Sequence, residues 1–79
     1  MKDFERLMLA VYDGTVETSK PFVSLAALED QLKLDPETMK SLIFTLTQRS
    51  FLSANAPGNK LALSESGIAY TERNLKASK

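Results

Sequence analysis

The clearest hydrophobic pattern in the chain follows Asp35 and predicts an amphipathic helix. Its apolar positions recur at helical spacing and form one stripe, made of Met39, Leu42, Ile43 and Leu46. Asp35 can cap the first free backbone N–H groups of this helix, and Pro36 suits its first position, where a missing N–H costs nothing. We therefore expect a helix that ends near residues 49–50 and docks its stripe on a core.

The opposite side of this helix is mixed in character. It carries Glu37, Lys40, Ser41, Phe44 and Gln48. Glu37 is explained by the helix dipole, which favours negative charge in the first turn. Phe44 is the least ordinary member, because an aromatic residue opposite an apolar stripe does not serve packing alone. It belongs to a partner surface, or it is buried against the following hairpin, or the helical phase is wrong.

An earlier helix is predicted over residues 2–13. Its shared apolar face consists of Phe4, Leu7, Met8 and Val11. Gly14 is expected to break this helix, and residues 14–20 are polar enough for a loop. Leu9 lies off the apolar face, so we expect it to be exposed or covered by a partner.

The middle of the chain predicts a helix-turn-helix over about 24–50. Residues 21–23 form a short extended segment that can pair with a strand edge. Ser24 can cap a helix over 25–32. Residues 33–34 then make a tight connection to the amphipathic helix, and two helices joined by so short a turn are typical of this motif.

A hairpin and a last helix are predicted after it. Residues 51–52 begin an extended segment, 54–59 are rich in turn formers, and 60–63 alternate as in a half-buried strand, so about 51–63 reads as a hairpin.

Ser64 can cap a final helix over about 65–75. Ile68 and Leu75 should face inward, whereas Tyr70 should point away from them. Residues 76–79 are expected to fray.

Composition limits the function more than it defines it. The 79 residues suit one domain, 1–79, and ten basic residues balance ten acidic ones. Zero net charge argues against strong nonspecific nucleic-acid binding, which depends on positive charge, although it permits a locally basic surface. No apolar run approaches 18 residues, and the chain begins with a charged helical pattern. A cytoplasmic setting without a membrane partner is expected.

The chemistry of an enzyme has little support in the sequence. Histidine and cysteine are absent, which removes the commonest general base, the commonest metal ligand and thiolate chemistry. There is no glycine-rich phosphate loop. We therefore expect no catalytic residues, no cofactor and no metal.

The order helix, strand, helix, turn, helix, hairpin, helix resembles a winged helix-turn-helix domain. The segment VSLAALEDQLKLDPETMKSLIFTLTQRSFL is similar to the helix-turn-helix of MarR-like and related bacterial regulators, and NKLALSESGIAYTERNL is similar to their second wing strand and its exit, with Ser64 and Gly67 carrying the match. Two departures stand out. Ser50 occupies a place that is usually glycine, and the wing offers Asn55, Asn59 and Lys60 where family wings often carry arginine.

The resemblance implies a mainly helical α+β fold in which one strand follows the first helix and two strands follow the third. It also implies that the third helix enters the DNA major groove while the wing touches the backbone or minor groove. The implied DNA-binding residues are Thr38, Lys40, Ser41, Phe44, Thr45, Gln48, Arg49, Asn59 and Lys60. Gln48 suits adenine, Lys40 suits guanine or a phosphate, and Phe44 suits a thymine methyl.

Two functions remain open at this point. The first is a small transcriptional regulator that binds double-stranded DNA as a homodimer, with Lys20 and Lys33 as further phosphate contacts and with Leu9 and Tyr70 in the dimer interface. The second is a protein-interaction adaptor that binds no DNA, which zero net charge, Glu37 and Phe44 favour.

Overall fold

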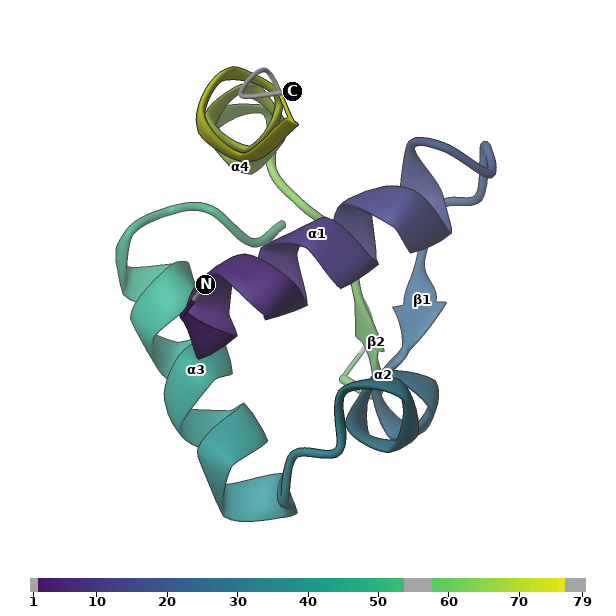
Figure 1. Cartoon of the computed structure of the whole chain (residues 1–79), viewed down its shortest axis with the longest axis vertical. Coiled ribbons are helices and arrows are strands. Elements are labelled where there is room, and N and C mark those ends of the chain that lie inside the picture. Colours follow the sequence, from purple (N-terminus) through teal and green to yellow (C-terminus); the bar gives the residue numbers. More distant parts are fainter. Residues whose placement is uncertain (1, 54–57, 77–79) are drawn as a thin grey trace.

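The structure, a computed structural model, describes residues 2–53 and 58–76. Helices dominate these residues, and a small antiparallel sheet of two strands joins them (Figure 1). The expected mainly helical α+β class is therefore confirmed. The elements in chain order are α1 (Asp3–Thr15), β1 (Val23–Ser24), α2 (Leu25–Leu32), α3 (Pro36–Gln48), β2 (Lys60–Leu61), α4 (Glu65–Tyr70) and the π-helix η1 (Thr71–Lys76).

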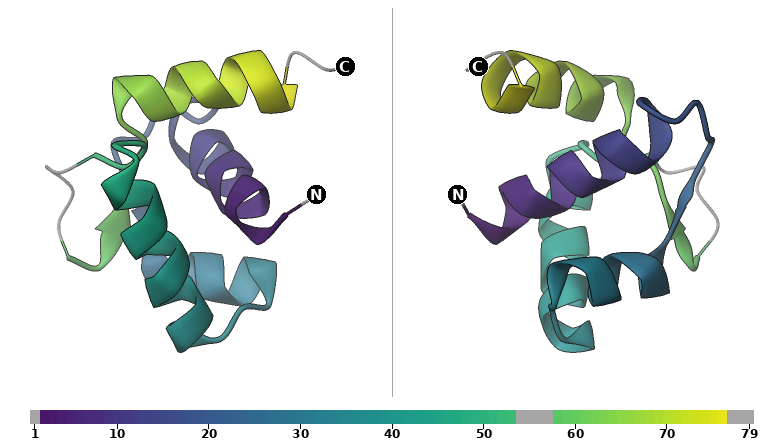
Figure 2. Two further views of the ribbon diagram at one scale, coloured as in Figure 1. Left: turned by 90° about the vertical axis from the view of Figure 1, so that its left-hand side faces the viewer. Right: turned by 45° about the vertical axis from the view of Figure 1, so that its right-hand side comes forward.

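Helix α1 forms the centre of the core. Leu7, Met8 and Val11 have no exposed surface, and α2, α3, β1 and η1 all contact this helix. Figure 2 shows α1 between the two middle helices and the C-terminal helix. The predicted apolar face is therefore the one that the other elements share, with Phe4 packed at its edge.

Gly14 does not break α1, contrary to the sequence prediction, because the helix continues to Thr15. A Cβ atom on Gly14 would lie 2.3 Å from Cγ1 of Val23. The residue thus allows β1 to approach the helix closely, which is a tertiary role that local helix propensity does not reveal. Leu9 also departs from expectation, since it is half-buried against the core of its own chain.

The sheet confirms part of the predicted strand arrangement. Val23 pairs with Leu61, and Ser24 pairs with Lys60, so the expected edge pairing of the segment before α2 is confirmed. Two strands were predicted after α3. Among the described residues, one strand, β2, follows α3. Leu52 forms an isolated antiparallel bridge with Leu63, beside which the Ser53 N–H donates to the Ala62 carbonyl at 2.8 Å. The predicted turn residues 54–57 lie outside the described residues.

The end of the α3 segment is joined to the start of α4 by a compact set of contacts. The Ser64 hydroxyl donates to the Ser50 carbonyl at 2.5 Å and accepts from the Gly67 N–H at 3.1 Å. The Ser64 N–H donates to the Phe51 carbonyl at 3.0 Å. A Cβ atom on Gly67 would lie 2.1 Å from that carbonyl oxygen, so glycine is required for this approach.

The C-terminal helix changes character after Tyr70. It was predicted as one helix over 65–75, but α4 passes into the π-helix η1 at Thr71. Leu75 is buried and Ile68 packs against the core, as expected. Tyr70 is half-buried, because its ring lies against the ring of Phe51 with centroids 4.9 Å apart.

Polar contacts attach η1 to α1 and to the turn that follows it. Lys76, which was predicted to fray, donates to Asp13 at 2.7 Å and to Glu17 at 3.3 Å. The Tyr12 hydroxyl donates to Glu72 at 2.8 Å, and this hydrogen bond raises the pKa of Tyr12. The hydrogen bond to Asp13 likewise raises the pKa of Lys76, so Tyr12 stays protonated and Lys76 stays charged at neutral pH.

Replacing Gly67 by alanine should destabilise the fold. In an ordinary helix the change stabilises by about 1 kcal/mol, but here the new Cβ would collide with backbone that cannot move without disturbing Ser64. We expect the free energy of unfolding, measured with urea, to fall by about 1–3 kcal/mol, the usual range for overpacking.

Gly14→Ala is the matched control for this variant. Its Cβ would meet the side chain of Val23, not backbone, and a side chain adjusts more easily. Gly14→Ala should therefore cost less than Gly67→Ala, and the reverse order would contradict the proposed role of the Phe51–Gly67 contact.

Candidate nucleic-acid interface

The start of α3 is fixed by the predicted cap. Asp35 accepts from the Thr38 N–H at 3.4 Å and from the Thr38 hydroxyl at 2.5 Å. The hydroxyl hydrogen bond is the main cause of a lowered pKa of Asp35, so this carboxylate stays ionised at neutral pH. Thr38, predicted to contact bases, has its hydroxyl proton engaged in the cap.

The inner side of α3 is anchored by the predicted stripe. Met39 and Leu46 are buried, whereas Leu42 and Ile43 are half-buried and pack against the core. The helix therefore docks with the phase that the sequence indicates, and its opposite side faces solvent.

The end of α3 depends on an unusual backbone conformation at Ser50. Its φ angle is 62°, in the left-handed region that favours glycine. This turn lets the Phe51 N–H donate to the Leu46 carbonyl at 2.9 Å and directs the chain toward Leu52. Because glycine adopts this conformation without steric cost, glycine would be favoured at the position of Ser50.

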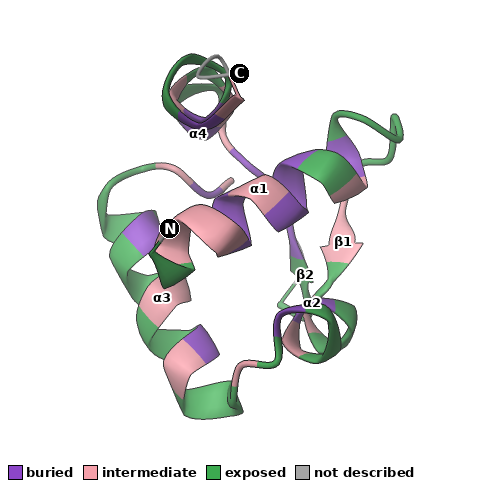
Figure 3. Cartoon of the chain, in the orientation of Figure 1, coloured by how far each residue is buried: buried purple, intermediate pink, exposed green. Residues whose placement is uncertain are grey.

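The outer side of α3 brings together five of the predicted site residues. Lys40, Ser41, Phe44, Thr45 and Gln48 are all exposed. Phe44 is 66% exposed, the largest value among the large hydrophobic residues of the described chain. Figure 3 shows exposed residues along the side of α3 that faces away from α1. Two of the three interpretations of Phe44, burial and a wrong helical phase, are thus excluded.

The polar side chains on this outer face are available to a ligand. Within the described ranges, no side-chain hydrogen bond or ion pair engages Lys40, Ser41, Thr45 or Gln48. Glu37 is exposed in the first turn of the same helix. The face can therefore offer hydroxyl, amide and ammonium groups to a ligand without breaking an internal contact.

The remaining predicted contacts lie on neighbouring segments. Arg49 is the exposed C-cap of α3. Lys60 is exposed on β2, the strand that pairs with β1. Asn59 is exposed just before β2, and its carbonyl accepts from the Leu25 N–H at 3.0 Å. Lys33 is exposed in the turn between α2 and α3, with a φ angle of 59°.

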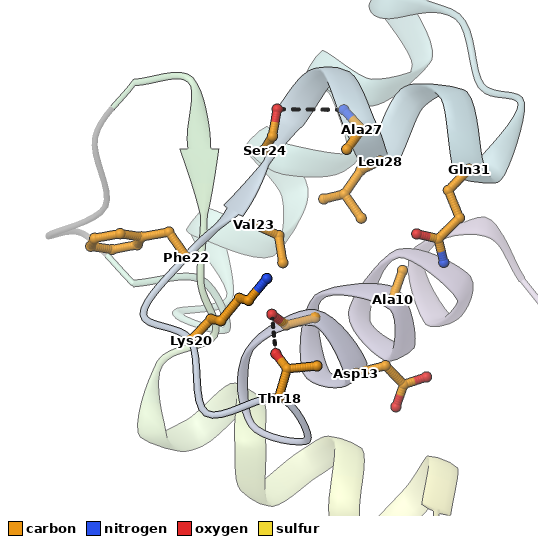
Figure 4. Close-up of a pocket in the computed structure, with 11 residues that line it drawn as sticks. Ala10, Asp13, Thr18, Lys20, Phe22, Val23, Ser24, Ala27, Leu28 and Gln31 are labelled. Carbon is orange, nitrogen blue, oxygen red and sulfur yellow. Dashed lines mark hydrogen bonds between the residues drawn. The ribbon is translucent and has the colours of Figure 1, made fainter.

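A cleft of about 400 Å³ lies between α1, β1 and α2. Figure 4 shows the Lys20 ammonium pointing into it and the Asp13 carboxylate turned away, toward its ion pair with Lys76. No residue of α3 lines this cleft, so Lys20 belongs to a different surface from the α3 face. Sequence reasoning missed the cleft because its walls come from separate segments without a shared motif.

The described residues contain no cluster of carboxylates that could hold a metal ion. None of the helices seen in this part of the chain has the length and apolar character needed to cross a bilayer. Comparison with models of known protein families, with curated proteins and with solved structures found no match in any of the three.

Replacing Ser50 by glycine should stabilise the fold. Glycine adopts the observed φ without the steric cost that a Cβ atom imposes, and part of this gain is lost to its greater freedom when unfolded. We expect the free energy of unfolding to rise by about 0.5–1 kcal/mol in urea titrations.

Ser66→Gly tests the same substitution at an exposed position inside α4. It should lower the free energy of unfolding, because glycine is the poorer helix former. If both variants shifted stability in the same direction, the left-handed turn at Ser50 would not be the cause.

Proposed function

We propose that the chain is a winged helix-turn-helix protein that binds double-stranded DNA as a homodimer and acts as a small transcriptional regulator. The observation that carries the proposal is the exposed, uncommitted outer face of a capped and anchored helix. Helix α3 follows α2 after a turn of three residues, 33–35, which is the arrangement of a helix-turn-helix.

The dimensions of α3 suit the major groove. Its 13 residues make a rod about 20 Å long and about 10–12 Å wide, and the groove is about 12 Å wide. In this pose Gln48 pairs with adenine, and Lys40 reaches guanine or a phosphate. Arg49, together with Lys60 and Asn59 near β2, contacts the sugar–phosphate backbone.

The small number of cations makes a dimer necessary for useful affinity. Of the five cations considered from the sequence, Lys20 lies on the cleft surface. The other four, Lys33, Lys40, Arg49 and Lys60, are available for phosphates, which corresponds to a salt slope of about −3.6 for one chain. A dimer doubles the contacts and reads two half-sites. Leu9 and Tyr70 keep part of their surface exposed on the first and last helices, where we place the interface.

DNA binding should be sensitive to salt and to the cations of α3. In fluorescence anisotropy with mixed-sequence duplex, the affinity should fall steeply as salt rises, and the double variant Lys40→Ala with Arg49→Ala should abolish binding because it removes the phosphate contacts nearest the groove.

Arg73→Ala is the control for lost charge. Arg73 is exposed on η1, on the opposite side of α1 from the proposed surface, and its removal should leave the affinity nearly unchanged. Equal losses in both variants would indicate a general charge effect and contradict the proposed α3 surface.

Self-association should be visible by sedimentation. At concentrations on the order of tens of micromolar, we expect a mass of two 8.7 kDa chains. Leu9→Gln should shift the equilibrium toward monomer, whereas Val16→Gln, at another partly exposed apolar residue of the same region, should not. A strict monomer for the natural chain would contradict the dimer.

Phe44 supports a second candidate function, a protein-interaction adaptor. Its large exposed surface and the neighbouring Glu37 suit an apolar groove on a protein. In that case Lys40→Ala with Arg49→Ala would have little effect on the interaction, whereas Phe44→Ala would abolish pull-down of the partner.

A further inference from the structure

Phe44 differs from every other apolar residue of α3. Met39, Leu42, Ile43 and Leu46 belong to the core or pack against it, whereas Phe44 is 66% exposed. Its ring makes no aromatic or cation–π contact with the described residues. Core packing therefore does not explain the ring, and a ligand of α3 would meet it directly.

The neighbours of Phe44 are polar groups that suit base edges. Lys40 lies one turn before it and Gln48 one turn after it, so the three side chains share one side of the helix. One helical turn advances about 5.4 Å, and one base pair advances about 3.4 Å. Phe44 and Gln48 can therefore reach adjacent or nearly adjacent base pairs.

The major groove offers one apolar group to such a ring. Thymine presents its C5-methyl there, whereas guanine, cytosine and adenine present hydrogen-bond donors and acceptors. A phenyl ring against those polar atoms would strip their water without replacing the lost hydrogen bonds. A ring against the methyl buries apolar surface on both sides.

We propose that Phe44 is a specificity-determining residue that selects a thymine by its C5-methyl, beside an adenine read by Gln48. This inference rests on the proposed DNA binding of α3. It identifies the preferred half-site as one that contains an A·T pair at the position opposite the middle of the helix.

The test uses two duplexes that differ in the methyl group alone. A site is first enriched from a random duplex library by the natural chain, and it is then synthesised with thymine or with deoxyuridine at every position. The natural chain should bind the thymine duplex about three- to fivefold more tightly for each methyl contacted.

Variants assign this preference to a side chain. Phe44→Ala should bind the two duplexes equally, and Phe44→Leu should keep part of the preference. Gln48→Ala is the matched control, because it should weaken binding to both duplexes while the preference for thymine remains. The urea midpoint of Phe44→Ala should equal that of the natural chain, since the ring is mostly exposed.

The possible failures are distinguishable. Salt-sensitive binding with equal affinity for both duplexes would overturn the inference and leave the proposed function intact. Persistence of the thymine preference in Phe44→Ala would also overturn it. Absence of binding to any enriched or mixed duplex would overturn the proposed function and the inference together, and would favour a protein groove as the ligand of Phe44.

Discussion

The burial of one face of α1 is the constraint on which the rest of this structure depends. A chain of 79 residues has little core to share, and Leu7, Met8 and Val11 occupy its centre without any exposed surface. Both middle helices, β1 and η1 contact α1. Helix α3 packs its apolar side against this core. This packing sets the orientation of α3 and directs its opposite side to solvent.

A second constraint acts where α3 ends. Ser50 turns the chain through a left-handed conformation, and the carbonyl of Phe51 then receives the Ser64 N–H and lies against Gly67. These are backbone approaches at short range, which tolerate little change in side-chain volume. These contacts connect the end of α3 to the start of α4. Because the Asp35 cap fixes the start of α3, the helix is held at both of its ends.

The sequence predicted those features of the fold that depend on local chemistry. The caps at Ser24 and Asp35 and the span of α3 follow from hydrogen bonding at helix ends and from the period of 3.6 residues. The period also placed Phe44 opposite the apolar stripe, but its exposure was decided only by the structure. The period was sufficient to predict that Lys40, Ser41 and Gln48 share one side of the helix with Phe44.

The features that were predicted wrongly depend on contacts between distant segments. Gly14 was predicted to break the first helix, but in the structure its missing side chain lets Val23 approach the helix closely. Leu9 and Tyr70 lie off the apolar faces on a helical wheel, yet each is partly covered within the chain, Leu9 by the core and Tyr70 by Phe51. The cleft beside Lys20 requires three elements at once. The spacing of apolar residues shows which face of a helix is buried. It does not show which other segment of the chain packs against that helix.

The most direct test of the central claim is a map of backbone amide chemical shifts during titration with duplex DNA. If α3 binds the duplex, the shifts should concentrate on its outer face, from Lys40 to Gln48, and extend to Lys60 on β2. The result that would contradict it is an unchanged α3 face, with shifts absent or confined to the cleft residues Ala27 and Gln31.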